Sequence, residues 1–394
     1  MANKKMANQA EKTLFQRNDG DEKERAICFS VCLKTQDEKE VLAGLEELKE
    51  LAHTAGAEVL AEIYQNRDKI DAKYYIGVGK LAEIKDLAEK LKANCLICDD
   101  ELSPAQLRNI EDYTKLKIID RSLLILDIFA GRATSAEGKL QVALAQAQYR
   151  LPRIQFMLGF NSRLAGGIGT RGPGESLKET DRRHIQRRIN TLREKLAELG
   201  KKRQIVRQHR TKSALTVAVV GYTNAGKSSL INSLCKSDLY TENQVFATLD
   251  PACRHLWLPK LATDSLLIDT VGFIRKLPHH LIEAFKSTLE EAAKADLLLL
   301  VLDAADPQAV AQLEVVENLL KQIGAAEVPR LYVANKMDLL HNDLAQVDSL
   351  LLNKLHTLCQ PQDLFFISVK GNFQIEKLRA ALQNKLQEMA IEVH

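Results

Sequence analysis

The sequence predicts an α/β protein in three parts: a small α/β domain, a long antiparallel helical hairpin, and a larger α/β domain built on a parallel sheet. Apolar strands alternate with amphipathic helices between residues 26 and 119, and the same alternation returns after residue 214. Between these regions, leucine and isoleucine recur at helical spacing. Because 394 residues have room for two or three domains, we expect a disordered polar tail, the small domain, the hairpin and the larger domain over residues 1–22, 23–135, 136–212 and 213–394.

The small domain is expected to contain four strands and three helices. Its strands are predicted at residues 26–33, 58–65, 95–98 and 117–119. Its helices are predicted at residues 37–55, at residues 79–92 and from Ser103 onward. Strands that alternate with helices indicate a mostly parallel sheet. This part of the sequence carries no recognisable catalytic constellation.

The cysteines and the lack of long apolar segments indicate the compartment. The chain has seven cysteines without a disulfide framework, which suits a reducing environment. Cys95 and Cys98 form a C-x-x-C sequence within a predicted strand, and no second Cys or His pair stands at metal-binding spacing. We favour a structural role for the pair over zinc or redox chemistry. No apolar stretch approaches about 20 residues and no signal peptide is recognisable, so we expect a cytoplasmic protein without a membrane span. We also expect a monomer, although the sequence leaves the oligomeric state open.

The hairpin is predicted from two apolar seams. One seam contains Leu140, Leu144, Ala147 and Leu151, and the other contains Ile185, Ile189, Leu192, Leu196 and Leu199. Spacings of three and four residues are typical of a coiled coil. The loop between the helices, about residues 152–175, is short enough for an antiparallel arrangement.

The second arm of the hairpin is strongly basic. Residues 178–212 contain thirteen Lys or Arg and four Asp or Glu, a local excess of +9, whereas the whole chain carries only +3. A field of that sign favours polyanions, of which nucleic acid is the obvious one. The glycines and arginines at the tip, residues 163–175, either allow close approach to a phosphate surface or form a flexible turn without a role.

The larger domain begins with a phosphate-binding motif. Residues 221–228 match G-x-x-x-x-G-K-[ST], after a strand predicted at 215–220 and before a helix. Such a loop wraps phosphate oxygens with backbone N–H groups. Lys227 is expected to neutralise the β- and γ-phosphates, and the Ser228 hydroxyl to bind Mg²⁺. The predicted contacts are Gly221, Tyr222, Thr223, Asn224, Ala225, Gly226, Lys227, Ser228 and Ser229.

A second motif selects the base. Asp338 follows a predicted strand in the sequence Asn335, Lys336, Met337, Asp338. Its carboxylate can accept a pair of hydrogen bonds from N1–H and N2–H₂ of guanine. Adenine lacks this pair of donors, so its binding would leave the carboxylate unpaired, at a cost that can reach about 10⁴-fold. At the end of the next predicted strand, Ser368, Val369 and Lys370 are expected to contact the base. These motifs predict a P-loop G domain for GTP and GDP.

Two further segments complete the predicted site. Asp269, Thr270, Val271 and Gly272 end a strand, where Asp269 would hold Mg²⁺ through water and the Gly272 N–H would meet the γ-phosphate. In the loop Phe246, Ala247 and Thr248, we expect Thr248 to bind Mg²⁺ when GTP is present. The predicted metal ligands are therefore Ser228 and Thr248, and the predicted catalytic residues are Lys227, Thr248 and Gly272.

Phe273 stands where many GTPases carry a glutamine that orients the attacking water. Because a phenyl ring cannot hydrogen-bond water, we expect slow hydrolysis that a partner stimulates. Asn224 either helps to hold K⁺ near the phosphates or shapes the loop. The remaining strands of this domain are predicted at residues 265–268, 297–302, 330–334 and 364–367, with a last helix at residues 371–388.

With these residues in place, the chain resembles the HflX family of translational GTPases. The identifying segments are residues 120–129 and 132–141, the glycine-rich residues 166–175, and Phe273. The resemblance covers roughly residues 26–371. It implies binding to the large ribosomal subunit, where the arm and its tip would approach ribosomal RNA, and a role in splitting or rescuing ribosomes under stress.

The function predicted is therefore GTP binding with slow hydrolysis that the large ribosomal subunit stimulates. One alternative is a nucleotide-switched regulator that binds a different RNA or protein. Another is an ATP-dependent RNA remodeller, which the basic arm would also suit.

Overall fold

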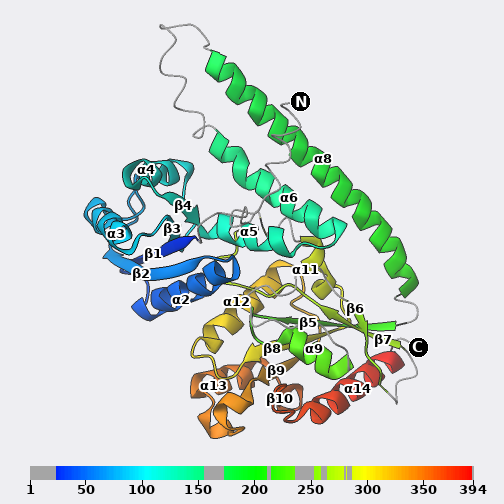
Figure 1. The fold of residues 1–394 in the computed structure, drawn as a ribbon. Helices are drawn as coiled ribbons and strands as arrows, with labels where there is room; N and C mark the ends of the chain where they lie inside the picture. Colours follow the sequence, from blue (N-terminus) through cyan, green and yellow to red (C-terminus); the bar gives the residue numbers. More distant parts are fainter. Residues whose placement is uncertain are drawn as a thin grey trace. The chain divides into compact units, whose positions relative to one another are not determined.

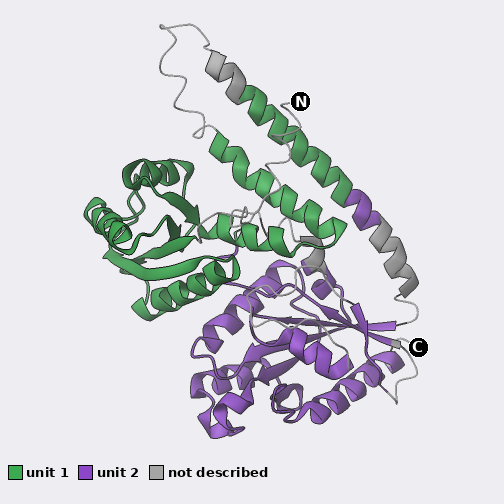
Figure 2. Cartoon of the chain, viewed as in Figure 1, with its two compact units in different colours: residues 1–196, 278–281 green, residues 197–277, 282–394 purple. Residues whose placement is uncertain are grey.

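The computed structural model describes residues 24–154, 173–210, 214–235, 253–258, 264–278, 281 and 286–392 (Figure 1). The chain divides into two compact units (Figure 2). The first contains Met1–Leu196 with Pro278–Leu281, and the second contains Ala197–Leu277 with Ile282–His394. The predicted tail and the greater part of the predicted tip lie outside the described residues.

The first unit contains a four-stranded sheet in the order β2-β1-β3-β4, and every strand pairing is parallel. All four predicted strands are confirmed. Their bounds are Arg25–Leu33 for β1, Glu58–Arg67 for β2, Cys95–Cys98 for β3 and Lys117–Asp120 for β4. Cys95 and Cys98 are buried in β3, and burial raises the pKa of the Cys95 thiol to about 12. Within the described residues, no group of three or more His, Cys, Asp or Glu side chains is arranged to hold a metal ion.

Helices cover this sheet, and side-chain caps fix where two of them begin. Asp37 accepts a hydrogen bond from the backbone of Lys39, and Ser103 forms a capping box with Gln106. Both starts agree with the sequence prediction. Apolar side chains of β1, α3 and α4, including Phe29, Ile84 and Ile110, form one core cluster, and α2 packs against α5. The bounds are Glu38–Thr54 for α2, Val78–Leu91 for α3, Pro104–Thr114 for α4 and Arg121–Arg132 for α5.

The start of α5 contains a buried cation. Arg121 is 2% exposed. One of its guanidinium nitrogens lies 2.7 Å from Oδ1 of Asp99, and another lies 2.6 Å from Oε1 of Glu47. Because an isolated buried charge is very costly, this pairing with two carboxylates is what makes Arg121 tolerable in the core.

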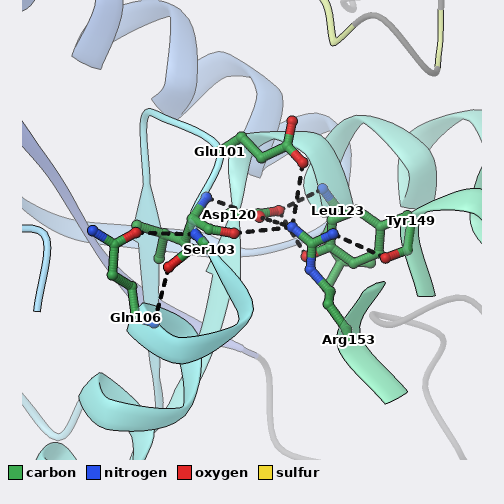
Figure 3. A network of polar contacts seen from close by, with 8 residues as sticks. Glu101, Ser103, Gln106, Asp120, Leu123, Tyr149 and Arg153 are labelled. Carbon is green, nitrogen blue, oxygen red and sulfur yellow. Dashed lines mark hydrogen bonds and ion pairs between the residues drawn. The ribbon is translucent and has the colours of Figure 1, made fainter. Parts of the chain in front are cut away.

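A second buried cation, Arg153, lies next to the last residue of the described segment 24–154 (Figure 3). It donates to the backbone oxygens of Tyr149 and Leu102, at 2.9 and 3.0 Å, and to Oδ2 of Asp120, at 3.2 Å. Its guanidinium also lies over the Tyr149 ring, and the Tyr149 hydroxyl donates to Asp120. Burial raises the pKa of Asp120, although the charge of Arg153 and hydrogen bonds from the Leu123 N–H, the Tyr149 hydroxyl and the Leu102 N–H oppose the shift. The network ties the end of the first hairpin arm to the sheet.

The hairpin consists of α6 (Ala136–Arg150), the short 3-10 helix η2 (Leu151–Arg153) and α8 (Pro173–Arg210). Leu144 and Ala147 of α6 pack against Ile189 and Leu192 of α8, which confirms the predicted seam. The second arm was predicted from residue 178, but the helix begins at Pro173, a residue that suits the first turn of a helix. The packed residues of the seam, which end at Leu196, belong to the first compact unit, whereas Leu199, also predicted in the seam, belongs to the second.

The second unit contains a six-stranded sheet in the order β10-β9-β8-β5-β7-β6. The five predicted strands are confirmed as parallel neighbours, and β6, a three-residue antiparallel edge strand, was not predicted. The bounds are Ala214–Gly221 for β5, Cys253–His255 for β6, Asp264–Asp269 for β7, Leu297–Asp303 for β8, Arg330–Asn335 for β9 and Leu364–Phe366 for β10. The carboxyl ends of β5, β7, β8 and β9 therefore meet at one edge of the sheet, where ligands bind in open α/β folds.

Helices lie on both faces of this sheet (Figure 1). Apolar residues of α11, α12 and α13 fill the core on one face, and those of α9 and α14 fill the core on the other. The bounds are Lys227–Cys235 for α9, Lys286–Ala293 for α11, Ala309–Gln322 for α12, Ser349–Leu358 for α13 and Ile375–Glu392 for α14. Short 3-10 helices occupy Met337–Leu340 (η3), Leu344–Gln346 (η4) and Pro361–Asp363 (η5).

The last helix starts later than predicted. It was expected from Gly371, but it begins at Ile375. Asn372 and Gln374 have φ values of 50° and 56°, in the left-handed region, and Phe373 forms a β-bridge with Ser368, so residues 371–374 make a turn instead. None of the described helices is both long enough and apolar enough to cross a membrane.

Candidate nucleotide-binding site

The predicted phosphate-binding loop lies between β5 and α9, in the required strand–loop–helix context. Asn224 has φ 60° and Gly226 has φ 94°, both in the left-handed region. A Cβ atom at Gly226 would lie 2.3 Å from Nδ2 of Asn335, so only glycine fits there. The loop is therefore curled tightly enough to turn backbone N–H groups toward one point.

Lys227 opens α9 and is buried in this loop. Its ammonium donates to the backbone oxygens of Gly221, at 3.1 Å, and Tyr222, at 2.7 Å. Burial lowers the pKa of Lys227 to about 8, and the charge of Asp269 opposes that shift. A cation held by neutral carbonyl groups gains more from an added anion than one already paired with a carboxylate, so this geometry suits a phosphate.

Ser228 and Asp269 lie side by side beneath the loop. The Ser228 hydroxyl donates to Oδ2 of Asp269 at 2.9 Å, and Asp269 is buried at the end of β7. A hydroxyl and a carboxylate are oxygen ligands of the kind that Mg²⁺ prefers. Next to them, the Thr270 hydroxyl donates to the backbone oxygen of Val219, which fixes the path out of β7. Ser229 follows in the first turn of α9 and is half-buried.

Asn335 connects three of the predicted motifs. Its Nδ2 donates to the backbone oxygen of Ala225 at 3.0 Å, and its Oδ1 accepts from the backbone N–H of Val369 at 3.2 Å. The phosphate loop, the Asn335–Asp338 segment and the Ser368–Lys370 segment, predicted separately, therefore converge on one side chain.

The carboxylate of Asp338 is oriented by its neighbours. The Ser368 hydroxyl donates to Oδ1 of Asp338 at 2.5 Å and itself accepts from the backbone N–H of Gly371 at 2.8 Å. Met337, which precedes Asp338 in the sequence, is buried and donates its N–H to the backbone oxygen of Ile367. Val369 is half-buried and Lys370 is exposed. This arrangement can present a fixed carboxylate to two adjacent donors of a ligand.

The sequence reasoning missed Asp303, which pairs with Lys336. Oδ2 of Asp303 lies 2.7 Å from Nζ of Lys336, and Lys336 itself is held at φ 65°. Asp303 ends β8, at the same edge of the sheet as the other motifs. A carboxylate directly after an apolar strand was the signal that could have identified it.

Gly272 and Phe273 lie against the phosphate loop. A Cβ atom at Gly272 would come within 2.8 Å of Thr223 Cγ2 and 3.0 Å of Lys227 Nζ, so the backbone passes very close to the loop. The Phe273 ring is 1% exposed and belongs to the core. Val271, which precedes them, is buried. The predicted loop residues Phe246, Ala247 and Thr248 lie outside the described residues.

Three family models match consecutive parts of the chain. They are described as GTP-binding GTPase N-terminal, over residues 43–130, GTP-binding GTPase Middle Region, over residues 132–210, and 50S ribosome-binding GTPase, over residues 216–336. The boundaries between the matched parts fall near the predicted ends of the small domain and of the hairpin.

Curated relatives match most of the chain. A protein named GTPase HflX from Caldanaerobacter subterraneus subsp. tengcongensis is 54% identical over 320 residues, which cover 81% of this chain and 74% of that protein. Another GTPase HflX, from Lacrimispora saccharolytica, is 50% identical over 80% of this chain and 74% of its own length. A GTP-binding protein from Sulfolobus solfataricus, solved with GDP, is 27% identical with a TM-score of 0.48, over 93% of this chain and 99% of that one. Identity of this extent to the named relatives means that the chain belongs to the HflX family of GTPases.

Proposed function

We propose that this chain couples GTP hydrolysis to binding of the large ribosomal subunit. As an HflX-family GTPase, the chain binds guanine nucleotide and hydrolyses GTP. The proposal assigns these activities to named residues and adds the partner. It also divides the chain into the small domain, the hairpin and the G domain, with boundaries near residues 135 and 212, which the limits of the three family models support.

The guanine base is proposed to bind Asp338, and the convergence of three motifs on Asn335 carries this assignment. Lys336 would lie over the base, and Asn335 would hold the Asn335–Asp338 segment in place. The Ser368–Lys370 segment would form the other side of the base site. The phosphates would lie in the loop from Gly221 to Ser229, against Lys227.

An exchange of base preference tests this assignment. Asp338→Asn replaces a carboxylate acceptor with an amide that also donates, so GDP affinity is expected to fall by about 100-fold or more, while affinity for the xanthine nucleotide rises. Asp343→Asn is the matched control, because Asp343 is exposed and caps η4, a role that Asn fills equally well. Unchanged GDP affinity in Asp338→Asn would remove Asp338 from the base site.

Hydrolysis is proposed to use Mg²⁺ held by Ser228 and Thr248, with Asp269 acting through water. The Ser228–Asp269 hydrogen bond supports the presence of a hard cation site there. When bound, the metal would offset negative charge that develops on the phosphates. Lys227, Thr248 and the Gly272 N–H would contact the same phosphates. Because the Phe273 ring is buried in the core, the chain offers no side chain at that position to orient water, and hydrolysis by the isolated protein is expected to be slow.

Asn224 is proposed to help hold K⁺ beside the phosphates. It is exposed at the bend of the loop and has a left-handed backbone conformation. Turnover measured in K⁺ and in Na⁺ separates this idea from a loop-shaping role, since identical rates in the two salts would leave only the loop-shaping role.

The large subunit is proposed as the partner because the hairpin concentrates positive charge. Burial and the nearby charge of Arg188 lower the pKa of Arg150, so cations of the two arms repel each other across the hairpin. Repulsion of this kind costs stability in the free protein, and a polyanion such as ribosomal RNA would relieve it. The family model described as a 50S ribosome-binding GTPase, which covers residues 216–336, supports the same partner. Splitting or rescue of ribosomes under stress is the role proposed for the complex.

Co-sedimentation with purified large subunits tests this partner. The chain is expected to bind the subunits when it carries a non-hydrolysable GTP analogue and to bind them more weakly when it carries GDP. Removal of two exposed cations in the double variant Arg182→Ala, Arg187→Ala is expected to reduce binding and to flatten its dependence on salt concentration by roughly two units of slope. Asp181→Asn, Glu194→Asn on the same helix changes exposed acidic residues and should leave binding intact or stronger. A lack of nucleotide-dependent co-sedimentation would contradict the ribosome proposal.

A further inference from the structure

The pairing of β5 with β7 continues beyond the end of β7. Within the strands, Val219 pairs with Asp269, but the next bridge joins Tyr222 to Phe273, so one extra residue has entered the β7 side. An insertion of this kind is a β-bulge, which re-aims the backbone and is common beside active sites. The inserted residue falls within Thr270–Gly272, the segment proposed to meet the γ-phosphate.

Backbone hydrogen bonds hold the chain after the bulge against the phosphate loop. The Thr223 N–H donates to the Phe273 oxygen at 2.8 Å, and the Phe273 N–H donates to the Gly221 oxygen at 3.1 Å. The rings of Tyr222 and Phe273 lie in the same core cluster, so burial of apolar surface adds to these bonds.

A side chain of the phosphate loop completes this attachment. The hydroxyl of Tyr222, which is 4% exposed, accepts a hydrogen bond from the backbone N–H of Arg275 at 2.8 Å. The bond spans from the loop to the second residue after Phe273. Unlike the two backbone bonds, it can be removed by substitution without changing the main chain. Its loss would leave a partly buried N–H without this acceptor.

We propose that Tyr222 is a positioning residue that holds the Gly272 N–H in place for the γ-phosphate, so that the affinity for GTP relative to GDP depends on the Tyr222 hydroxyl. This inference rests on the proposed role of Gly272. The Gly272 backbone lies close against Thr223 and Lys227. A segment fixed in advance loses little freedom when the γ-phosphate binds, whereas a released segment must be ordered first.

The effect is expected to be selective because GDP has no γ-phosphate. Release of residues 271–275 would lower the fraction of molecules in which Gly272 is in place, and only ligands with a γ-phosphate would lose affinity in proportion. GDP would keep its contacts with Lys227 and with the rest of the loop. A purely structural role for Tyr222 would instead weaken both nucleotides alike.

Affinities of the full chain for GDP and for a non-hydrolysable GTP analogue provide the test. In Tyr222→Phe, which keeps the buried ring, the analogue is expected to bind about five- to tenfold more weakly, and GDP affinity should change by less than about twofold. Tyr332→Phe is the matched control. Tyr332 is also a buried tyrosine of this core and donates to Glu317 at 2.9 Å, but it lies on β9 and outside the proposed site, so both affinities should stay as in the natural chain.

Gly272→Ala separates the two levels of the proposal. Its Cβ would collide with Thr223, so the analogue should lose more affinity than GDP. If this variant shows no selectivity, the proposed role of Gly272 fails. If Gly272→Ala is selective while Tyr222→Phe weakens both nucleotides equally or neither, the role of Gly272 stands and the inference about Tyr222 is overturned.

Discussion

The two units of this chain bury cations in different ways. In the first unit, Arg121 is held by Asp99 and Glu47, and Arg153 is held by Asp120 together with backbone oxygens. In the second unit, Lys227 donates to two backbone oxygens, while Asp269, whose charge acts on Lys227, hydrogen-bonds Ser228. The arginines are paired with opposite charge within the fold, whereas the lysine is solvated by neutral groups.

This difference separates a structural charge from a binding charge. A buried ion pair is already compensated, and breaking it leaves an isolated charge that destabilises the fold. A lysine with a pKa lowered to about 8 has little negative charge near it in the free protein. An anion that enters the loop therefore gains electrostatic attraction from a cation that the fold itself does not neutralise. Mutation of the buried cations in the first unit is therefore expected to change the stability of the fold. Mutation of the buried lysine in the second unit is expected to change ligand affinity.

Arg121→Met would give the largest effect on stability. It removes the buried cation that pairs with buried Asp99 and half-buried Glu47, and breaking a buried ion pair typically costs about 3–5 kcal/mol of the free energy of unfolding. Denaturant unfolding of the chain measures this loss. Arg108→Met removes a half-exposed ion pair with Asp112 and should cost less than about 1 kcal/mol. An equal, small loss in both variants would remove the distinction between the two kinds of arginine.

Lys227→Met is expected to do the reverse. GDP affinity should fall by about 100-fold or more, near 3 kcal/mol, because the buried cation beside the phosphates is gone. The free energy of unfolding without nucleotide should change by less than about 1 kcal/mol, since Met removes a poorly compensated buried charge. Titration with a fluorescent GDP derivative and denaturant unfolding measure the two quantities. A variant that unfolds as readily as Arg121→Met would break the comparison.

Asp303→Asn extends the comparison to the ion pair between Asp303 and Lys336, which we assign to the proposed base site. Removing the negative charge frees Lys336 from its position over the proposed base site, and GDP affinity is expected to fall about three- to tenfold, near 1 kcal/mol. Glu314→Gln, which breaks the exposed pair between Glu314 of α12 and Lys354 of α13, should leave GDP affinity unchanged. Equal affinities in both variants would restrict Asp303 to a structural role.

Proton uptake should give the smallest signal. Nucleotide phosphates favour charged Lys227 and raise its pKa above about 8, so binding takes up a proton only where the free protein has begun to lose it. Calorimetry in two buffers at pH 8.5 should therefore detect uptake of a fraction of a proton, and GDP affinity should fall as pH rises through this range. At pH 6.5 the lysine is charged in both states, and uptake by this group should vanish. Proton release at pH 8.5 would contradict the assignment.

Much of the fold could be predicted because its signals are local. Apolar runs located nine strands, and cap residues such as Asp37 and Ser103 located helix starts. The edge strand β6 was missed because three residues carry no usable periodicity. The start of α14 was placed too early because the left-handed turn before it is set by a bridge between Ser368 and Phe373, which the sequence does not show.

The motifs of the site could also be predicted, but the contacts between them could not. The sequence indicates Lys227 and Asp338 through their spacing and context. It does not indicate that Asn335 joins the loop to Val369, or that the Tyr222 hydroxyl reaches Arg275, since these contacts depend on how distant segments pack. It also does not indicate that Arg121 and Arg153 are buried, because arginine is normally exposed and only the fold supplies the carboxylates that bury it.

The most direct test of the central claim is the rate of GTP hydrolysis with and without purified large ribosomal subunits. We propose that the site, with Lys227 and Asp338 in place but with Phe273 buried where a water-orienting side chain would stand, suffices for nucleotide binding and supports only slow hydrolysis without a partner. The rate is therefore expected to be low for the chain alone and to rise several-fold with the subunit. The rise should be smaller in the double variant Arg182→Ala, Arg187→Ala. A rate that the subunit leaves unchanged, with nucleotide bound and the chain folded, would contradict this account.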